Sequence, residues 1–343
     1  MNHSLDHLSP HPIMLAPMVG LTHYAVRKAI SEFLPAGARA LWPTEMLNSR
    51  RIPSQHVNQA PEINFMDVEN GLCPQLLANE EEFIRLSVRR LEKWGAKAID
   101  INMGCPVVKA LKHNYGVALM GDAKYAAEVV RMTVAAGTLP VSVKLRAGLE
   151  SQSFEYLVDF VGGLFEAGAK WITVHPRTAE QMRKGNPDWD LLAKLKQIFP
   201  GRTIVGNGDV QVLDDIRELF EKTNCDRVMV GRALIVKPWL LGCVTRDSAG
   251  KLVYGEEPDA YAQGEMYGKF LKRVVEECTA HYEEPQGLRR LRFLITYGKP
   301  WVEFGNFLHG RIAAAQNYAE MKLAVDQFFE TPQRMTAKST LQN

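Results

Sequence analysis

The chain has 343 residues, of which 46% are hydrophobic and 23% are charged. These proportions are typical of a globular protein large enough to bury a sizeable core, and they exclude disordered, collagen-like and disulfide-scaffold proteins. The 41 Lys and Arg residues nearly balance the 39 Asp and Glu residues, which leaves a formal charge of +2. Tight binding to a polyanion would therefore need a local basic patch.

Membrane and export signals are absent from the sequence pattern. The first eleven residues are polar and hold no apolar segment of the kind found in a signal peptide. No later stretch approaches the roughly 18 apolar residues that are needed to span a membrane. We therefore expect a cytoplasmic protein with no membrane partner.

Short β-rich segments alternate with helix-like sequence over the first two thirds of the chain. They are predicted as strands over residues 12–16, 40–45, 72–76, 98–102, 141–146, 171–175, 203–207 and 227–230. Such alternation implies parallel strands joined by crossover helices, and eight units fit a closed (β/α)8 TIM barrel. A doubly wound open sheet is the alternative. The segment that follows Asn79, a good N-cap residue, is predicted as a covering helix that ends at Gly95.

The pattern changes after the eighth strand. Residues 231–241 read as a short helix, and a polar stretch with Gly250, Gly255 and Pro258 follows. Helical periodicity then dominates over 261–281, 288–297 and 312–329. We predict an N-terminal tail over 1–11, a barrel over 12–245, a small C-terminal helical domain over 255–331 and a flexible tail over 332–343.

The carboxyl ends of the strands carry an unusual number of polar residues, and this is where TIM barrels place their functional groups. Desolvating Lys144, Arg146, His175 and Arg177 together would be costly unless an anionic ligand were present. Gly208 and Gly231 follow strands seven and eight, where barrels commonly bind a phosphoryl group through backbone N–H groups. The pattern predicts a phosphorylated cofactor.

Cys105 stands apart from the other four cysteines because it follows Gly104 and precedes Pro106 in a loop at this end of the barrel. The spacing leaves three roles open: thiolate nucleophile, metal ligand and proton donor. A metal is least favoured, because no Cys or His lies at ligand spacing and the chain has no CxxC motif. We expect no metal and no disulfide framework.

At the level of motifs the chain resembles the tRNA-dihydrouridine synthases from residue 12 to about residue 241. The element Asn102-Met103-Gly104-Cys105-Pro106, with Lys109 and then 116–120 downstream, is its most specific part. Further matching elements are Leu15-Ala16-Pro17-Met18, Gln75, Val143-Lys144-Leu145-Arg146, Val174-His175-Pro176-Arg177-Thr178, Asn207-Gly208-Asp209 and Gly231-Arg232. The Thr44-Glu45 pair after the second predicted strand is similar to the sequence at this place in the bacterial subgroup that acts on uridine 16 of the D-loop.

The resemblance implies FMN at the barrel mouth, reduced by NADPH, and a tRNA uridine swung out of its stack to lie over the flavin. Hydride would pass from flavin N5 to C6 of uracil. The carbanion at C5 would then take a proton from Cys105, because an ordinary thiol is mostly protonated at pH 7.

The resemblance also implies roles for the other residues. Lys144 would lie beside the N1 and O2 edge of the flavin, and Gln75 beside its pyrimidine edge. The ring would rest on Pro17, Met18 and Val19, and the ribityl chain and phosphate would be held by His175, Asn207, Gly208, Asp209, Gly231 and Arg232. The substrate would contact Asn102, Arg146 and Arg177.

A helical C-terminal domain that helps to hold tRNA is also what the family leads one to expect. We predict tRNA contacts at Arg289 and Arg290, which cluster with Arg292, and consider the pairs at 50–51, 109 and 112, and 183–184 as further basic patches. We expect a monomer. Two alternatives stay open: an FMN-dependent dehydrogenase of free pyrimidines, and an RNA-binding barrel that has lost its flavin.

Overall fold

The computed structural model describes residues 4–56, 71–106 and 113–339. Eight parallel strands form one sheet in the order β1-β8-β7-β6-β5-β4-β3-β2, and β1 and β2 contact each other where the sheet curls round. The strands are β1 (Ile13–Leu15), β2 (Trp42–Asn48), β3 (Leu72–Leu77), β4 (Ile99–Met103), β5 (Val141–Arg146), β6 (Trp171–His175), β7 (Thr203–Asn207) and β8 (Arg227–Val230). The predicted (β/α)8 barrel is confirmed.

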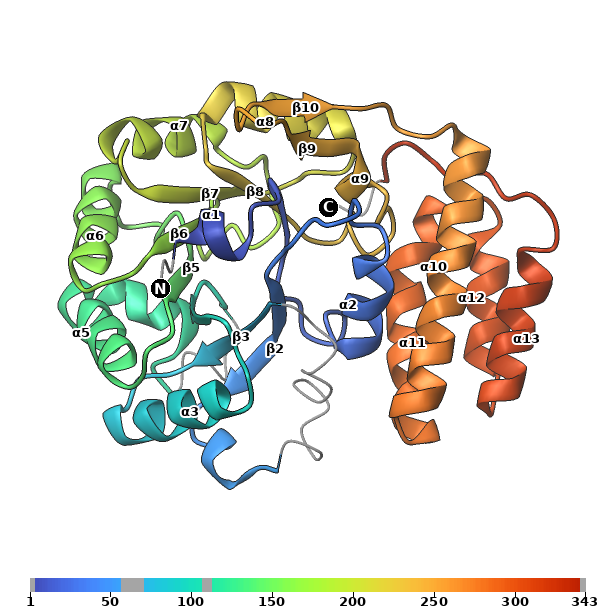
Figure 1. The fold of residues 1–343 in the computed structure, drawn as a ribbon, viewed down its shortest axis with the longest axis horizontal. Helices are drawn as coiled ribbons and strands as arrows, with labels where there is room; N and C mark the ends of the chain where they lie inside the picture. Colours follow the sequence, from blue (N-terminus) through green and yellow to red (C-terminus); the bar gives the residue numbers. More distant parts are fainter. Residues whose placement is uncertain (1–3, 57–70, 107–112, 340–343) are drawn as a thin grey trace.

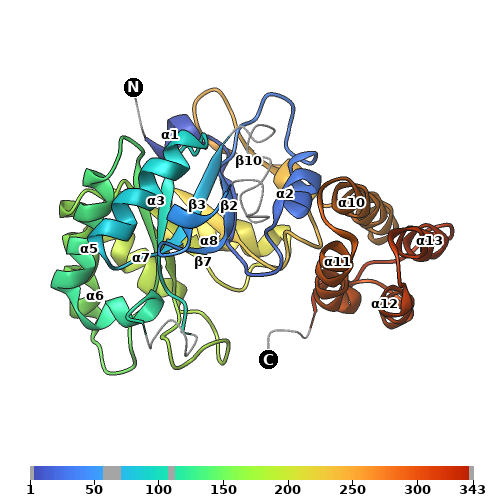
Figure 2. The ribbon, with the colours of Figure 1, turned by 90° about the horizontal axis from the view of Figure 1, so that it is seen from below.

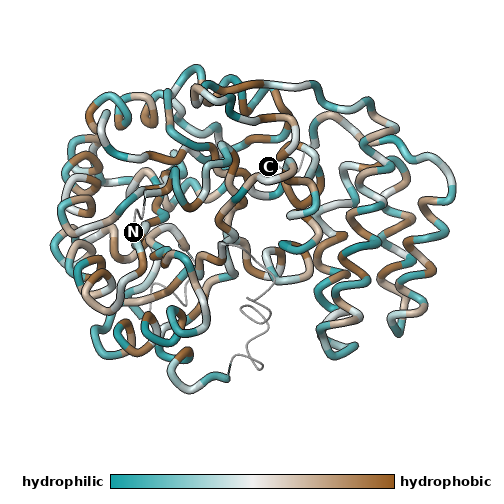
Figure 3. Tube along the Cα trace, in the orientation of Figure 1, coloured by the Kyte–Doolittle hydropathy of each residue, from teal (hydrophilic) through white to brown (hydrophobic). Residues whose placement is uncertain are grey.

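Helices surround the sheet on its outer side (Figure 1). They are α2 (Tyr24–Ser31), α3 (Glu81–Lys93), α5 (Ala123–Ala135), α6 (Phe154–Glu166), α7 (Trp189–Ile198) and α8 (Leu213–Thr223). Hydrophobic and hydrophilic residues alternate along them (Figure 3), as expected for helices with one buried face. The predicted N-cap of α3 is wrong by one residue: Glu80 occupies that position, and the Asn79 side chain instead donates to the carbonyl of His113.

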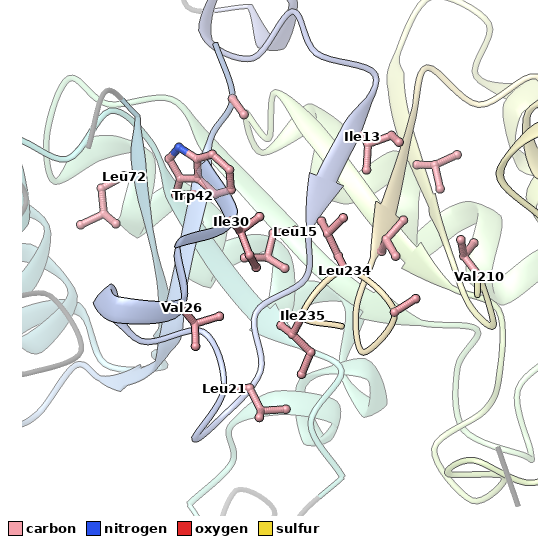
Figure 4. Close-up of a cluster of buried hydrophobic side chains, with 14 of the residues drawn as sticks. Ile13, Leu15, Leu21, Val26, Ile30, Trp42, Leu72, Val210, Leu234 and Ile235 are labelled. Carbon is pink, nitrogen blue, oxygen red and sulfur yellow. The ribbon is translucent and has the colours of Figure 1, made fainter. Parts of the chain in front are cut away.

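Two apolar clusters stabilise the barrel. Ile13 and Leu15 of β1 belong with Val26 and Ile30 of α2 to the outer cluster, between sheet and helices (Figure 4). Met14 points the other way, as strand alternation requires, and joins the inner cluster. The short helix α1 (Leu5–Leu8) contributes Leu5 to that inner cluster. Residues 4–11 are thus part of the barrel structure rather than a tail.

The helical domain packs beside the barrel, with α10 against α2 (Figures 1 and 2). Its helices are α10 (Ala260–His281), α11 (Glu284–Gly298), α12 (Gly305–Ala314) and α13 (Tyr318–Phe328). The single helix predicted over 312–329 is wrong. Helix α12 ends at Ala314, and a second helix begins at Tyr318. The Asn317 side chain caps the start of α13 by accepting from the N–H of Glu320.

The link between the two domains also differs from the prediction. Residues 231–239 form turns rather than a helix, and only α9 (Leu240–Cys243) is helical there. An antiparallel hairpin follows, formed by β9 (Val244–Arg246) and β10 (Leu252–Tyr254). A short 3-10 helix, η4 (Gly116–Gly121), lies after β4, and two others are η1 (Ile52–Ser54) and η5 (Lys299–Trp301).

The C-terminal segment 332–339 connects the helical domain back to the barrel. The Met335 N–H donates to the carbonyl of Ala260, and Lys237 Nζ donates to the carbonyl of Ala337 at 2.7 Å. Lys338 forms an ion pair with Asp215 of α8 at 2.7 Å. These contacts correct the expectation of a flexible tail for residues 332–339. Within the described ranges, no helix is long and apolar enough to cross a membrane.

Candidate functional site

A cavity of about 400 Å³ opens at the carboxyl ends of the barrel strands. Its volume is in the range of sites for small molecules and cofactors. Its walls include most of the residues singled out in the sequence: Pro17, Met18, Val19, Cys105, Lys144, Arg146, His175, Arg177, Asn207, Gly208, Asp209, Gly231 and Arg232. Gln75, Asn102, Arg289 and Arg290 do not line it.

Cys105 is half-buried and lies in the cavity wall, whereas the four other cysteines are buried elsewhere. Its carbonyl accepts from the N–H of Val117 at the start of η4. Gly116 makes this close approach possible, because it has a φ of +58° and a Cβ there would lie 2.6 Å from the Cys105 carbonyl oxygen. The glycine of the downstream motif therefore supports the cysteine loop.

Gln75 and Asn102 lie beneath the cavity floor in a buried hydrogen-bonded chain. Gln75 Nε2 donates to Asp100 Oδ2 at 2.7 Å, and Asn102 Nδ2 donates to Gln75 Oε1 at 2.8 Å. Asn102 Oδ1 accepts from the backbone N–H groups of Gly104 at 3.1 Å and Cys105 at 2.9 Å. Both amides are thus engaged within the protein and adjoin the cysteine loop.

The cavity wall is cationic. Burial, with a contribution from Arg146, lowers the pKa of Lys144 to about 8. Burial and the nearby Lys144 lower the pKa of His175 to about 2, so its imidazole is neutral at physiological pH. His175 Nδ1 is buried and has no hydrogen-bond partner among the described residues. A wall of this kind suits an anionic group.

Arg177, which follows β6, and Asp209, which follows β7, form a largely buried bidentate ion pair. Arg177 Nη1 donates to Asp209 Oδ1 at 2.7 Å, Nη2 donates to Oδ2, and Nη2 also reaches the carbonyl of Gly185 at 2.6 Å. The pair steadies a turn in which Gly208 has a φ of +118° and Asp209 a φ of +54°. The two residues that the sequence assigned to different ligands therefore hold one another.

Arg146 links two loops at the rim of the cavity. Its Nε donates to the carbonyl of Gly104 at 3.0 Å, and its Nη1 donates to the carbonyl of Thr178 at 2.9 Å. Burial, with a contribution from Arg177, lowers its pKa. The guanidinium thus ties the cysteine loop to the loop that follows β6.

The predicted basic patch on α11 requires a correction. Arg289 is exposed, but Arg290 is only 9% exposed and pairs with Glu45 of β2 at 3.1 Å. Arg290 also lies over the Tyr282 ring at 5.1 Å, and Arg292 donates to the carbonyl of Ala315. Arg290 is not available to grip RNA, because it is buried between the barrel and the helical domain. Lys109 and Lys112 lie outside the described residues.

Comparison with known proteins supplies the family. The family described as dihydrouridine synthase matches residues 14–297. The chain belongs to this family. A "Probable tRNA-dihydrouridine synthase" of Mycobacterium tuberculosis is 29% identical over 324 residues, covering 92% of this chain and 82% of that protein. One of Rickettsia typhi is 33% identical over 321 residues, covering 91% and 95%. Among solved structures, nitroalkane oxidase from Streptomyces ansochromogenes is 14% identical with a TM-score of 0.43, covering 68% of each chain.

Several cavity residues of this dihydrouridine synthase family member were missed in the sequence: Met46, Met182, Gln211, Tyr297, Trp301 and Ser339. Tyr297 ends the family match on α11, whereas Trp301 and Ser339 lie beyond it. Tyr297, Trp301 and Ser339 reach the cavity because the helical domain and the C-terminal segment dock against the barrel. No local sequence pattern indicates this docking. Arg183, noted only as part of a basic pair, also lines the cavity. The described residues contain no cluster of His, Cys, Asp or Glu suited to a metal ion.

Proposed function

We propose that this dihydrouridine synthase family member reduces a D-loop uridine of tRNA to 5,6-dihydrouridine, with FMN as its cofactor and NADPH as its reductant. One observation carries the proposal: the half-buried thiol of Cys105 lies in the wall of a cationic cavity at the barrel mouth. The printed names of the M. tuberculosis and R. typhi relatives support the reaction and the tRNA substrate.

The residues of the cavity fit the phosphate of FMN. His175 Nδ1 is a buried polar atom without a partner among the described residues, and Arg232 lines the same cavity. We propose that these two groups hold the phosphate and ribityl chain together with Asn207, Gly208, Asp209 and Gly231. Pro17, Met18 and Val19 would support the ring, with Lys144 at its edge, whereas Gln75 is fully buried and its amide bonds to Asp100 and Asn102. When bound, the flavin supplies a hydride to C6 of uracil.

The chain's own chemistry is then a proton transfer. Cys105 would donate its thiol proton to C5 of the uracil ring, since its loop faces the cavity. The Lys144 ammonium would stabilise negative charge that develops nearby, in a cavity where burial strengthens electrostatic interactions. Arg146, Arg177 and Asn102 would orient the substrate or the loops around it.

The helical domain favours a large substrate over a free pyrimidine. Tyr297 of α11 and Trp301 of η5 line the same cavity as Cys105, so this domain borders the opening through which a nucleotide would enter. We propose a monomer, because one chain supplies both walls of the cavity. We propose that it acts in the cytoplasm, because its proposed substrate is tRNA. Thr44 and Glu45 are buried and form hydrogen bonds with Gln75, Gly20 and Arg290. They are therefore not placed to contact tRNA directly, and they do not support uridine 16 as the modified position.

A comparison of electron acceptors tests the proposal. The protein is reconstituted with FMN, reduced with NADPH, and offered unmodified tRNA, uracil or orotate. We expect rapid reoxidation by tRNA alone, with dihydrouridine detected in the RNA. Protein that takes up no flavin would favour an RNA-binding barrel, and preference for a free pyrimidine would favour a dehydrogenase of small molecules.

Cys105→Ala tests the assigned proton donor. This variant should bind FMN and oxidise NADPH as the wild type does, but it should form little dihydrouridine because no thiol proton is available at C5. Cys225→Ala is the matched control, because Cys225 is buried in the outer cluster and outside the cavity lining. Wild-type turnover of tRNA by Cys105→Ala would remove Cys105 from the mechanism.

A further inference from the structure

A buried polar chain connects the interior of the barrel to the cysteine loop. Ser142, Asp100 and Gln75 lie level with one another on β5, β4 and β3, as their strand register shows. Asn102 follows Asp100 by two residues, so it lies on the same face of β4 and closer to the cavity. Asp100 and Asn102 are buried, and Gln75 and Ser142 are completely inaccessible to solvent.

The two ends of this chain determine the direction of every hydrogen bond between them. The Asp100 carboxyl accepts from Ser142 Oγ at 2.6 Å and from the amide nitrogen of Gln75. Burial raises the pKa of Asp100, and these two donors act in the opposite direction because they favour its charged form. A backbone N–H only donates, so Asn102 turns its oxygen to the N–H groups of Gly104 and Cys105. The oxygen and nitrogen of each amide, in Gln75 and in Asn102, have nearly the same shape and could be exchanged on that ground alone. Only one assignment gives hydrogen bonds both to the Asp100 carboxyl and to the backbone N–H groups of the cysteine loop.

We propose that Asp100 is a positioning residue for Cys105. Its carboxylate orients the Gln75 amide, which orients the Asn102 amide, and Asn102 Oδ1 then holds the backbone of the cysteine loop. Arg146 holds the same loop at Gly104 from the other side. The backbone that carries the thiol is therefore held through a residue that is not in the cavity lining. The consequence for turnover rests on the proposed function, but the effect on the thiol does not.

Alkylation of flavin-free protein with iodoacetamide, followed by intact mass, measures the positioning directly. The other four cysteines are buried, so the first adduct reports on Cys105. Asp100→Leu has similar size but accepts no hydrogen bond, and we expect it to label several-fold faster than the wild type as the loop is released. Asp100→Asn can still accept from Gln75 while its NH2 donates to Ser142 Oγ, so it should stay near the wild-type rate.

Gln75→Met tests whether the result for Asp100→Leu comes from misfolding or from the loss of charge rather than from the broken hydrogen-bond chain. It breaks the link between Asp100 and Asn102 but keeps the carboxylate and its bond with Ser142. We expect it to label as fast as Asp100→Leu. Thr173→Val is the matched control inside the barrel, because the buried Thr173 Oγ1 has no hydrogen-bond partner among the described residues; it should label like the wild type.

Turnover provides the second measurement. In Asp100→Leu we expect kcat for tRNA to fall by about 100-fold with an unchanged KM, the size of effect that a displaced catalytic group produces. Labelling at the wild-type rate in folded Asp100→Leu and Gln75→Met would overturn the positioning role. Altered labelling together with a wild-type protein that does not reduce tRNA would instead refute the proposed function and leave the positioning role intact.

Discussion

Replacing Arg290 with Ala should destabilise the protein rather than weaken RNA binding alone. The Arg290 side chain is 10% exposed and the Glu45 side chain is 7% exposed, so both charges lie in the interface between barrel and helical domain. In Arg290→Ala, Glu45 stays buried and loses its counter-ion. It keeps the donor that the Gly20 N–H supplies in the loop after β1.

The magnitude follows from that burial. Breaking a buried ion pair by removing one partner costs about 3–5 kcal/mol, because the remaining charge is uncompensated. Loss of the Arg290 contact with the Tyr282 ring adds to this cost. With a urea m value of about 3 kcal/mol per M, the unfolding midpoint should fall by about 1–2 M.

Urea unfolding of flavin-free protein, followed by far-UV circular dichroism, measures this shift. Arg289→Ala is the matched control, because the neighbouring Arg289 is exposed and its loss should change the free energy of unfolding by less than about 0.5 kcal/mol. Adding Glu45→Gln to Arg290→Ala should recover part of the loss, since it removes the unpaired charge. An unchanged midpoint in Arg290→Ala, with weaker tRNA binding and a smaller salt slope, would refute the reasoning and restore Arg290 as an RNA contact.

Three further outcomes are expected. Gly264→Ala in α10 should lower the free energy of unfolding by about 1–3 kcal/mol, because its Cβ would lie 1.9 Å from the carbonyl oxygen of Gln333. Gly310→Ala in α12 meets nothing within 4 Å and should be neutral or stabilising by up to about 1 kcal/mol; equal chemical denaturation curves for the two variants would contradict this packing. Burial lowers the pKa of Lys144 to about 8, so between pH 8 and about 10 the unfolded chain binds more protons and the flavin-free protein gains stability as pH rises. Lys144→Met should lose this rise in urea titrations, and a variant with the wild-type slope would show that Lys144 is not its source. The pKa of His175 is lowered to about 2, so its imidazole NMR signals should stay constant from pH 5 to pH 8 in flavin-free protein, and a titration near pH 6.5 would disprove its burial.

Local patterns determined the positions of the strands because a buried parallel strand needs a short apolar segment wherever it lies in the fold. Strands β5, β6, β7 and β8 begin and end at the predicted residues. The same reasoning placed Cys105 at the barrel mouth, since the carboxyl ends of parallel strands meet on one side. The family followed from short motifs on those ends, and the match over 14–297 confirms it.

Helix boundaries were less predictable where tertiary contacts override propensity. Helical periodicity continues through 312–329, but the chain turns at Ala315 so that α12 and α13 can pack against one another. Residues 332–339 look like a polar end in the sequence. They are held by Ala260, Lys237 and Asp215, which lie far away along the chain.

The amino-acid order by itself therefore determined the barrel, the end at which the cavity opens, the cysteine at that end and the family. Only the tertiary structure decided that Arg289 is exposed and Arg290 buried, that Asp209 pairs with Arg177, and that Tyr297 and Trp301 reach the cavity. The physical reason is that periodicity reports which face of one element is apolar. The charge or cavity that faces a side chain belongs to another element, and docking alone brings the two together.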